Sequence, residues 1–328
     1  MTEKTVLITR IIPRAGIDLL KERYRVLINE HDRPLTAREL LDLSLECDGL
    51  LCLLTDTIDK DFFEARPNIR AVANYAVGFN NIDIQAATAR GIPVSNTPEV
   101  LTDATADLAF ALIFSVARRI VQADIHLRSG EWGGWGPLQF LGSGVWGATL
   151  GVVGMGNIGR AVARRGVGLS MTVCYADDFI AAGTDFGFPA TRLSLEELLE
   201  TADFVSLHVP LTESTRHLIG GKELSRMKKT AYLINTSRGA VIDEAALAAA
   251  LKNGDIAGAG LDVFEHEPKV TKKLCALPNT VLLPHIGSAT EQARTNMAIM
   301  AAKNLIAMLE GDEIPNLVNH DYLKQGPS

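Results

Sequence analysis

The stretch ATLGVVGMGNIGRAVARRGVGLSMTVCYAD, residues 148–177, decides the fold of this chain. Its first part, Leu150–Val153, is a short apolar run of the kind that forms a buried parallel strand. The turn Gly154-Met155-Gly156-Asn157-Ile158-Gly159 follows, then a predicted helix over Arg160–Gly168 and a predicted strand over Met171–Tyr175. Two parallel strands joined by a glycine turn and a helix form one unit of an open α/β sheet.

The residues of this turn suit the binding of a dinucleotide. Gly154 allows the tight turn, Gly156 lets the backbone approach a pyrophosphate, and Gly159 lets the helix pack close to the strand. The N-terminus of the helix offers unpaired N–H groups and a partial positive charge to the phosphates. We therefore predict a cofactor site that includes Gly154, Gly156, Asn157, Ile158 and Gly159. A glycine turn that binds nothing is the alternative.

An acidic pair after the second strand bears on the choice of cofactor. Asp177 follows Gly159 by 18 residues and can accept hydrogen bonds from the adenosine ribose hydroxyls. Asp178 comes next, and no Lys or Arg appears before Arg192. A 2′-phosphate would meet negative charge there, so the pattern predicts NADH rather than NADPH. Alternatively, Asp178 points to solvent and carries no information.

Length and composition limit the class of protein. A chain of 328 residues can form two domains, and 32 Lys and Arg against 39 Asp and Glu leave no basic cluster for nucleic acid. The four cysteines show no C-x-x-C spacing, which favours free thiols in a reducing compartment. The sequence starts without a signal-peptide pattern and has no membrane-spanning run, so we expect a cytoplasmic protein.

The regions on either side of the glycine turn also alternate strands and helices. Residues 1–100 include a helix with a capping box, Thr36 and Glu39, and predict a parallel α/β domain of their own. This region lacks the glycine turn, so we do not expect the nucleotide there. Further strands and helices follow residue 177, and a long helix over Thr290–Leu309 is expected to return the chain to the first domain.

Two segments lie between the first α/β region and the glycine turn. Thr102–Arg128 is rich in alanine and leucine and predicts one long helix that crosses from the first domain to the second. The loop Ser129–Gly147 follows and holds all three tryptophans, Trp132, Trp135 and Trp146. Closely spaced tryptophans are enriched at interfaces, although they also cover a core beneath a glycine-rich loop.

Three polar segments follow predicted strands of the dinucleotide domain, namely Asn235–Gly239, Asp262–Pro268 and Pro284–Ser288. Ligands of open α/β sheets bind at the carboxyl ends of strands, so these segments can surround one crevice. An arginine can bind a carboxylate bidentately, and a histidine beside a carboxylate can donate a proton. The set suits hydride transfer to a 2-keto acid; a surface ion pair, a packed loop histidine and a Glu-Pro turn are the alternatives. The histidines expected to be structural are His208 and His217.

Several stretches across the chain carry a family resemblance. They are VGFNNID (77–83), TPEVLTDATADLAFAL (97–112), GVVGMGNIG (151–159), VPLTESTRHLIG (209–220), NTSRGAVIDEAAL (235–247), GLDVFEHEP (260–268) and LLPHIGSAT (282–290). In content and order they resemble the D-isomer-specific 2-hydroxyacid dehydrogenases, most closely the glyoxylate/hydroxypyruvate reductases. The resemblance implies an α/β fold in which a Rossmann NAD-binding domain, residues 101–290, is inserted in a flavodoxin-like substrate domain, residues 1–100 and 291–328.

The resemblance also implies a role for each matching residue. Arg238 would bind the carboxylate and carbonyl of the substrate, His285 would act as acid–base, and Glu267 would be its partner. Asp262 would hold the nicotinamide carboxamide. Further cofactor contacts are implied for Thr105, Val209, Pro210, Thr215, Thr236 and Gly287. Substrate contacts are implied for the backbone N–H groups of Val77 and Gly78 and for the side chains of Leu53 and Leu54.

The predicted activity is NADH-preferring, metal-free reduction of a small 2-keto acid, glyoxylate or hydroxypyruvate, to the D-2-hydroxy acid. D-lactate and D-3-phosphoglycerate dehydrogenases are alternatives, as is a corepressor-like protein that senses NADH without turnover. The resemblance implies a homodimer, with Trp135 as the candidate for reaching the active site of the neighbouring subunit. One departure from the family is Asn80, where relatives often carry Asp, and we expect it to affect the loop rather than catalysis.

Overall fold

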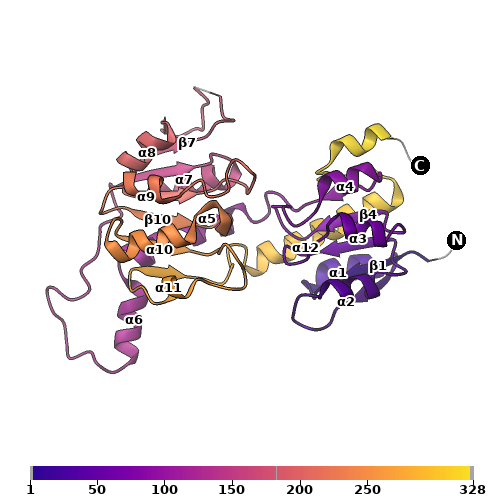
Figure 1. Cartoon of the computed structure of the whole chain (residues 1–328), viewed down its shortest axis with the longest axis horizontal. Helices are drawn as coiled ribbons and strands as arrows, with labels where there is room; N and C mark the ends of the chain where they lie inside the picture. The colour runs from indigo at the N-terminus through magenta and orange to yellow at the C-terminus, as the bar shows by residue number, and fades with distance from the viewer. Residues whose placement is uncertain (1–2, 182, 326–328) are drawn as a thin grey trace. The chain divides into compact units, whose positions relative to one another are not determined.

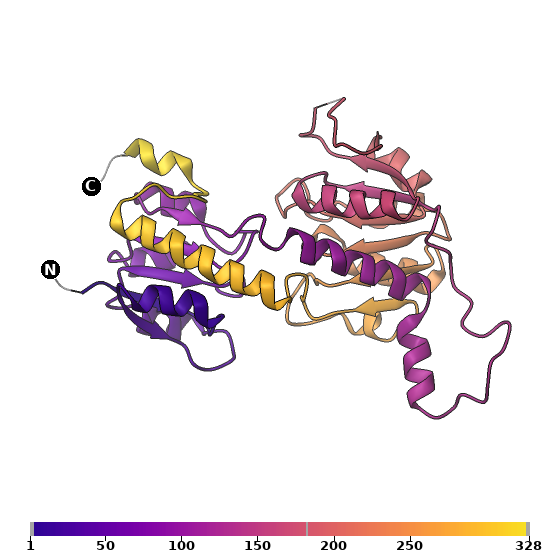
Figure 2. The ribbon, with the colours of Figure 1, turned by 180° about the vertical axis from the view of Figure 1, so that it is seen from behind.

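The computed structural model describes residues 3–181 and 183–325, which form two compact units. The first unit holds the residues up to Leu101 and those from Ala289 on, and the second holds Thr102–Ser288. Each unit is a parallel sheet with helices on both faces (Figures 1 and 2). The prediction of two parallel-sheet α/β domains is confirmed.

The sheet of the first unit has the strand order β2-β1-β3-β4-β5, with all neighbours parallel. This order is that of flavodoxin-like folds. The central strands β3 and β4 are buried along their whole length and, apart from Asn74, contain no polar side chain, as is typical of strands covered on both faces. The strands are β1 (Thr5–Ile8), β2 (Arg25–Ile28), β3 (Gly49–Cys52), β4 (Ala71–Asn74) and β5 (Val94–Ser95).

Helices cover both faces of this first sheet. On one face α2 (Ala37–Leu43), α3 (Lys60–Ala65) and α4 (Ile84–Ala89) enclose an apolar core with the strands. On the other face lie α1 (Arg14–Lys21) and the long α12 (Glu291–Glu310), side by side in Figure 2. The predicted capping box begins α2, because the N–H of Glu39 donates to the Thr36 hydroxyl and the N–H of Thr36 donates to the Glu39 carboxylate.

The sheet of the second unit has the order β12-β11-β10-β9-β6-β7-β8, again parallel throughout. The chain builds outward from β6 to β8, returns to β9 beside β6, and then builds outward in the other direction. This is the Rossmann arrangement, and its topological switch point lies between β6 and β9. The strands are β6 (Thr149–Val153), β7 (Thr172–Ala176), β8 (Thr191–Arg192), β9 (Phe204–Leu207), β10 (Tyr232–Asn235), β11 (Gly258–Leu261) and β12 (Thr280–Leu282).

Two apolar cores fill the space between this sheet and its helices. One contains α5 (Thr102–Ala117) and α7 (Asn157–Gly168), and the other contains α8 (Leu195–Thr201), α9 (Gly221–Arg226) and α10 (Glu244–Asn253). Asp243 caps α10, and Gly254 ends it with a left-handed φ of 74°. The remaining helical segments among the described residues are α6 (Ile120–Arg128), α11 (Lys272–Cys275), η1 (Gly239–Val241) and η2 (His320–Gln325).

The prediction of one helix over Thr102–Arg128 is wrong. The segment forms α5 and α6, separated at Arg119, whose φ of 55° lies in the left-handed region and interrupts helical geometry. Both helices belong to the second unit, so the segment does not cross between domains. Among the described residues, none of the helices combines the length and the apolar character needed to cross a membrane.

Candidate active site

The predicted site residues of the second unit lie in loops at the carboxyl ends of its strands. Because all its strands are parallel, these ends share one edge of the sheet. The glycine turn follows β6 and Asp177 follows β7. Past the switch point the edge carries Val209 and Pro210 after β9, Thr236 and Arg238 after β10, Asp262 and Glu267 after β11, and His285 after β12.

His285 and Glu267 form a hydrogen-bonded pair at this edge. The Nδ1 atom of His285 lies 2.8 Å from Oε2 of Glu267, and the N–H of Phe264 donates to Oε1 of the same carboxylate at 3.0 Å. His285 has a φ of 54°, a conformation that costs energy outside glycine, and its N–H donates to the carbonyl of Asp262 at 2.9 Å. Among residues 3–181 and 183–325 no hydrogen-bond partner is found for Nε2 of His285, so this atom is available to a reacting group.

Burial and neighbouring charges set the ionisation of this pair. Burial alone would raise the pKa of Glu267, but the hydrogen bond and charge of His285, the N–H of Phe264 and the charge of Arg238 together lower it below its ordinary value. Burial lowers the pKa of Arg238, and the charge of Glu267 opposes that effect. A carboxylate that stays ionised stabilises the protonated form of a neighbouring imidazole.

Asp262 makes contacts that sequence reasoning did not anticipate. Its side chain is buried, with Oδ1 accepting from the N–H of Ile286 at 2.7 Å and Oδ2 accepting from the N–H of Gly287 at 2.7 Å. The pKa of Asp262 is raised above its ordinary value, because burial outweighs the lowering effect of these N–H groups and of His285. The Thr105 hydroxyl donates to the carbonyl of Gly287 at 3.3 Å. Asp262 therefore fixes the loop that presents His285.

Glu244 anchors the loop that carries Glu267, and sequence reasoning missed it. It is the first residue of α10 and is 5% exposed. Its carboxylate accepts from the N–H of Glu265 at 2.5 Å and from the Thr271 hydroxyl at 2.5 Å, so it holds both ends of the segment around Glu267. The sequence signal was weak, because an acid at the start of a helix usually interacts with the helix dipole alone.

A glycine brings the arginine loop against this segment. A Cβ atom at Gly239 would lie 1.8 Å from the carbonyl carbon of Phe264, so only glycine fits. The neighbouring Asn235 amide donates to the carbonyl of Arg238 at 2.9 Å. The backbone of Arg238 is thus held beside the loop that carries Glu267.

The glycine turn and its surroundings fit NAD(P). Gly154 has a φ of 91°, and Gly156 is the N-cap of α7, where no side chain occupies the cap and an added Cβ would meet no atom within 4 Å. The first N–H groups of α7 thus lack a side-chain acceptor, as a pyrophosphate site requires. The hydroxyl of Thr236 is buried, and the described residues offer it no hydrogen-bond partner, which suits a polar group of the cofactor.

Asp177 is fixed against the glycine turn by three backbone donors. Oδ2 accepts from the N–H of Met155 at 2.7 Å, while Oδ1 accepts from Phe179 at 2.8 Å and Ile180 at 3.0 Å. A carboxylate has about four lone-pair positions, so about one remains for a ribose hydroxyl. The unpredicted strand β8 returns Arg192 to this place, where its guanidinium donates to the carbonyl of Asp177 at 2.9 Å.

The segment after β9 and the two histidines expected to be structural, His208 and His217, also have defined hydrogen-bond partners. The Thr215 hydroxyl donates to the carbonyl of Pro210 at 2.6 Å, which holds the segment after β9. His208 lies 2.8 Å from the Ser206 hydroxyl, and burial lowers the pKa of His208 to about 3. His217 lies 2.6 Å from the Glu265 carboxylate. Both histidines have structural partners away from the His285–Glu267 pair.

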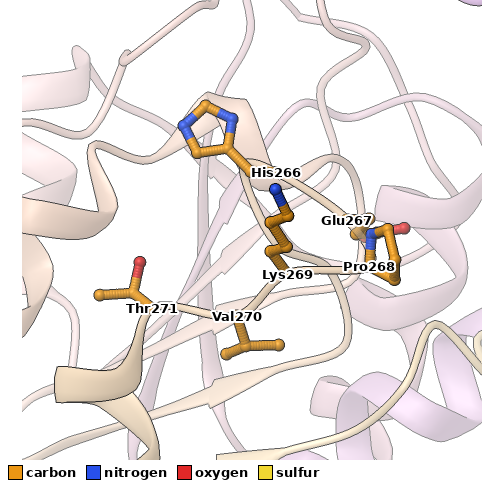
Figure 3. Close-up of a pocket in the computed structure, with 6 residues that line it drawn as sticks. All are labelled: His266, Glu267, Pro268, Lys269, Val270 and Thr271. Carbon is orange, nitrogen blue, oxygen red and sulfur yellow. The ribbon is translucent and has the colours of Figure 1, made fainter.

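A pocket of ≈ 590 Å³ lies against the loop that carries Glu267 (Figure 3). The Lys269 side chain extends toward His266 in this view, with Glu267 and Pro268 on the other side of the turn. The N–H of Lys269 donates to the carbonyl of His266 at 2.8 Å and closes the turn. The lining residues are His266, Glu267, Pro268, Lys269, Val270 and Thr271.

The predicted substrate residues of the first unit lie at the carboxyl edge of its own sheet. Leu53 and Leu54 follow β3 and are half-buried, while Val77 and Gly78 follow β4. Because β3 and β4 are neighbours, their loops meet at that edge. This is the position at which open α/β sheets bind ligands.

Comparisons with known proteins agree with this picture. Residues 110–287 match the family model described as "D-isomer specific 2-hydroxyacid dehydrogenase, NAD binding domain". Glyoxylate reductases of Thermococcus litoralis and Korarchaeum cryptofilum are 52% and 50% identical, each over 98% of both chains. A structure from Thermus thermophilus is 44% identical with a TM-score of 0.89, covering 96% of this chain and 99% of that one. The structure of a glyoxylate reductase from Paecilomyes thermophila is 33% identical with a TM-score of 0.86, covering 97% and 99%.

The fold and the site define an NAD(P)-dependent oxidoreductase with a Rossmann domain. Within that class, the chain belongs to the D-isomer specific 2-hydroxyacid dehydrogenase family, and the resemblance seen in the sequence is confirmed.

Proposed function

We propose that this enzyme reduces glyoxylate, and also hydroxypyruvate, to the corresponding 2-hydroxy acid with NADH as the preferred cofactor. The observation that carries the proposal is the His285–Glu267 pair at 2.8 Å, beside the loop of Arg238, in a chain similar to glyoxylate reductases over 98% of its length. When bound, the nicotinamide supplies the hydride that the carbonyl carbon accepts.

Each candidate residue has a task in this reaction. His285, protonated and held by Glu267, donates a proton from Nε2 to the carbonyl oxygen as that oxygen gains negative charge. Arg238 binds the substrate carboxylate and draws electron density from the carbonyl. In this proposal the second unit binds the cofactor, and the backbone N–H groups of Val77 and Gly78 in the first unit also bind the substrate carboxylate. Leu53 and Leu54 form an apolar wall.

The preference for NADH follows from the surroundings of Asp177. Its carboxylate is held in place by three N–H groups and has room for one ribose hydroxyl, whereas a 2′-phosphate would meet its charge. Arg192 donates to the main chain of Asp177 and moderates that repulsion. We therefore expect NADH to be preferred and NADPH to be used weakly.

A phosphorylated substrate is disfavoured at the edge of the first sheet. Arg10 follows β1 at this edge, and its guanidinium is held by the Asp32 carboxylate at 2.7 Å. A phosphate would have to compete with that ion pair. This contact argues against the 3-phosphoglycerate alternative. Turnover of a keto acid distinguishes the proposed enzyme from a protein that only senses NADH.

We also infer a homodimer in a reducing, cytoplasmic compartment. The structure describes every residue of α6, and none of them is buried. Trp135, in the loop that follows, is 83% exposed. Apolar surface of this extent marks a protein interface. The four cysteines are free thiols, as expected in a reducing compartment, and cell fractionation would test that location.

The test is to measure the oxidation of NADH through the absorbance of the cofactor. The substrates are glyoxylate, hydroxypyruvate, pyruvate and 3-phosphohydroxypyruvate. We expect glyoxylate and hydroxypyruvate to be reduced fastest. With NADPH we expect the rates to be lower by about tenfold, because the Asp177 carboxylate repels the 2′-phosphate. Equal or faster rates with NADPH would contradict the cofactor proposal. Binding of NADH without turnover of any keto acid would support the sensing alternative instead.

A further inference from the structure

We propose that Asn74 and Asn96 are positioning residues that turn consecutive backbone N–H groups of the first unit toward the substrate carboxylate. The inference rests on the proposed function, in which the loop after β4 binds that carboxylate. It adds side chains that act on the substrate only through the main chain of residues 76–79.

Three consecutive carbonyl groups in this loop are held by hydrogen bonds. The carbonyl of Ala76 accepts from the N–H of Thr97 at 2.8 Å. The carbonyl of Val77 accepts from the amide Nδ2 of Asn96 at 2.7 Å, and the carbonyl of Gly78 accepts from Nδ2 of Asn74 at 3.0 Å. Two of these three donors are thus side-chain amides.

The N–H groups of the same peptides point the other way. The peptide bonds of this loop are trans, and in a trans peptide the C=O and N–H point in opposite directions. Holding the three carbonyls therefore turns the N–H groups of Val77, Gly78 and Phe79 away from their anchors. These N–H groups have no acceptor within residues 3–181 and 183–325. Successive unpaired N–H groups form a site for an anion.

Asn74 also connects this loop to the one after β3. It is fully buried, and its Nδ2 lies 3.2 Å from the amide oxygen of Asn81. Asn81 in turn donates to the carbonyls of Leu53 and Asp56, each at 3.1 Å. The N–H of Leu53 donates to the buried carboxylate of Asp56 at 2.8 Å. One amide network thus sets the position of both proposed substrate loops.

The chemistry of this site suits a single carboxylate. The donors that the first unit supplies are neutral N–H groups, and Arg10 of that unit is engaged by Asp32. Neutral donors bind a monoanion in a fixed orientation, whereas a phosphate dianion requires more positive charge. The asparagines therefore contribute to affinity for the carboxylate of the substrate and have no part in the hydride and proton steps.

The first test compares Asn96→Ala and Asn74→Ala with the control Asn68→Ala. Asn68 belongs to the same unit and donates to the carbonyl of Cys47 at 2.6 Å, but it precedes β4, away from the carboxyl edge. We expect KM for glyoxylate to rise about tenfold in both test variants, because a hydrogen bond to a charged group is weakened. We expect kcat and the Kd of NADH to stay within about twofold, and the control to behave as wild type in all three.

A second variant distinguishes positioning from loss of folding. In Asn96→Asp an ionised carboxylate cannot donate to the carbonyl of Val77, but a protonated one can. We expect KM for glyoxylate and Kd for oxalate, measured calorimetrically on the NADH-loaded chain, to be raised at pH 8. Both should approach the wild-type values at the same pH only toward pH 4, because the ordinary pKa of Asp is about 3.9. Asn68→Asp should show no such recovery.

The outcomes separate this inference from the function on which it rests. Wild-type turnover of glyoxylate with an unchanged KM in Asn96→Ala and Asn74→Ala overturns the positioning role and leaves the proposed function intact. A wild-type chain that neither reduces glyoxylate nor binds oxalate overturns the proposed function and the inference with it. A raised KM in the alanine variants with pH-dependent recovery in Asn96→Asp supports both.

Discussion

The carboxylate of Glu267 supplies the negative charge that is hydrogen-bonded to His285 at the candidate active site. Its folded pKa lies below the ordinary value because His285, the N–H of Phe264 and Arg238 outweigh the effect of burial. A lowered folded pKa means that the ionised form stabilises the fold above the ordinary pKa of Glu, about 4.3. This stabilisation is lost as the pH falls through the folded value. The His285–Glu267 pair should therefore remain intact at neutral pH and fail only in acid.

Glu267→Gln tests this charge directly. The amide oxygen can still accept a hydrogen bond from His285, but without the carboxylate charge the protonated imidazole is less stable. We expect kcat for glyoxylate to fall roughly tenfold, the difference between a charged and a neutral hydrogen bond, with little change in the Kd of NADH. Glu200→Gln, which removes an exposed carboxylate paired with Arg226 at 2.7 Å, is the control. Wild-type kcat in Glu267→Gln would exclude the proposed role.

The loop between β11 and β12 shows how one buried acid can hold a whole segment. Glu244 accepts hydrogen bonds from both Glu265 and Thr271, on either side of Glu267. The Glu265 side chain is itself bound by His217 at 2.6 Å. A loop fixed at both ends keeps Glu267 within hydrogen-bond distance of His285, which is the form of support that catalytic groups require.

Replacing Glu244 should loosen this loop. Glu244→Ala leaves the N–H of Glu265 and the Thr271 hydroxyl buried without an acceptor, so we expect the free energy of unfolding in urea to fall by about 1–3 kcal/mol and kcat to fall with it. Glu244→Gln keeps one oxygen acceptor and should lose less of both. The matched control is Glu291→Ala, an exposed acid at the same helix position of α12, with an expected cost below about 1 kcal/mol. Equal losses in Glu244→Ala and Glu291→Ala would rule out the anchoring role.

Local patterns predicted those elements whose structure depends on neighbouring residues. The capping box of α2 and the glycine turn each involve residues a few positions apart, and both were recognisable. The break at Arg119 gives no such signal, because a left-handed arginine follows from tertiary packing rather than from propensity. The short strand β8 was missed for the same reason.

The same limit applies to the candidate site. The segments holding Arg238, Glu267 and His285 could be located because they follow apolar strands, and the family motifs assigned their roles. The buried partners of these residues could not, because Asp262 reaches Ile286 and Glu244 reaches Thr271 across 24 and 27 positions of the sequence. The Asn96 contact with Val77 likewise depends on the pairing of β4 with β5. Contacts of this length depend on the assembled sheet.

For the molecule as a whole, alternation of strands and helices was enough to predict two parallel sheets. The chain returns to the first unit through α12, as predicted. There α12 packs on α1 and on strands β3 and β4. In Figures 1 and 2, α6 and the chain that follows it project from the body of the second unit. This projection carries most of the exposed large apolar side chains of the described residues.

The exposed apolar side chains of α6 and of the chain that follows it predict a dimer. Ile125 and Leu127 of α6 are 60% and 56% exposed, and burying an apolar side chain of this size contributes about 1.5–3 kcal/mol. We expect the 35.4 kDa chain to elute with the mass of a dimer in light scattering, and Ile125→Asp with Leu127→Asp to produce monomers. Leu45→Asp, at a leucine 62% exposed in the first unit, should leave the dimer intact. A monomeric wild type, or a double variant that remains dimeric, would show that α6 is not the interface.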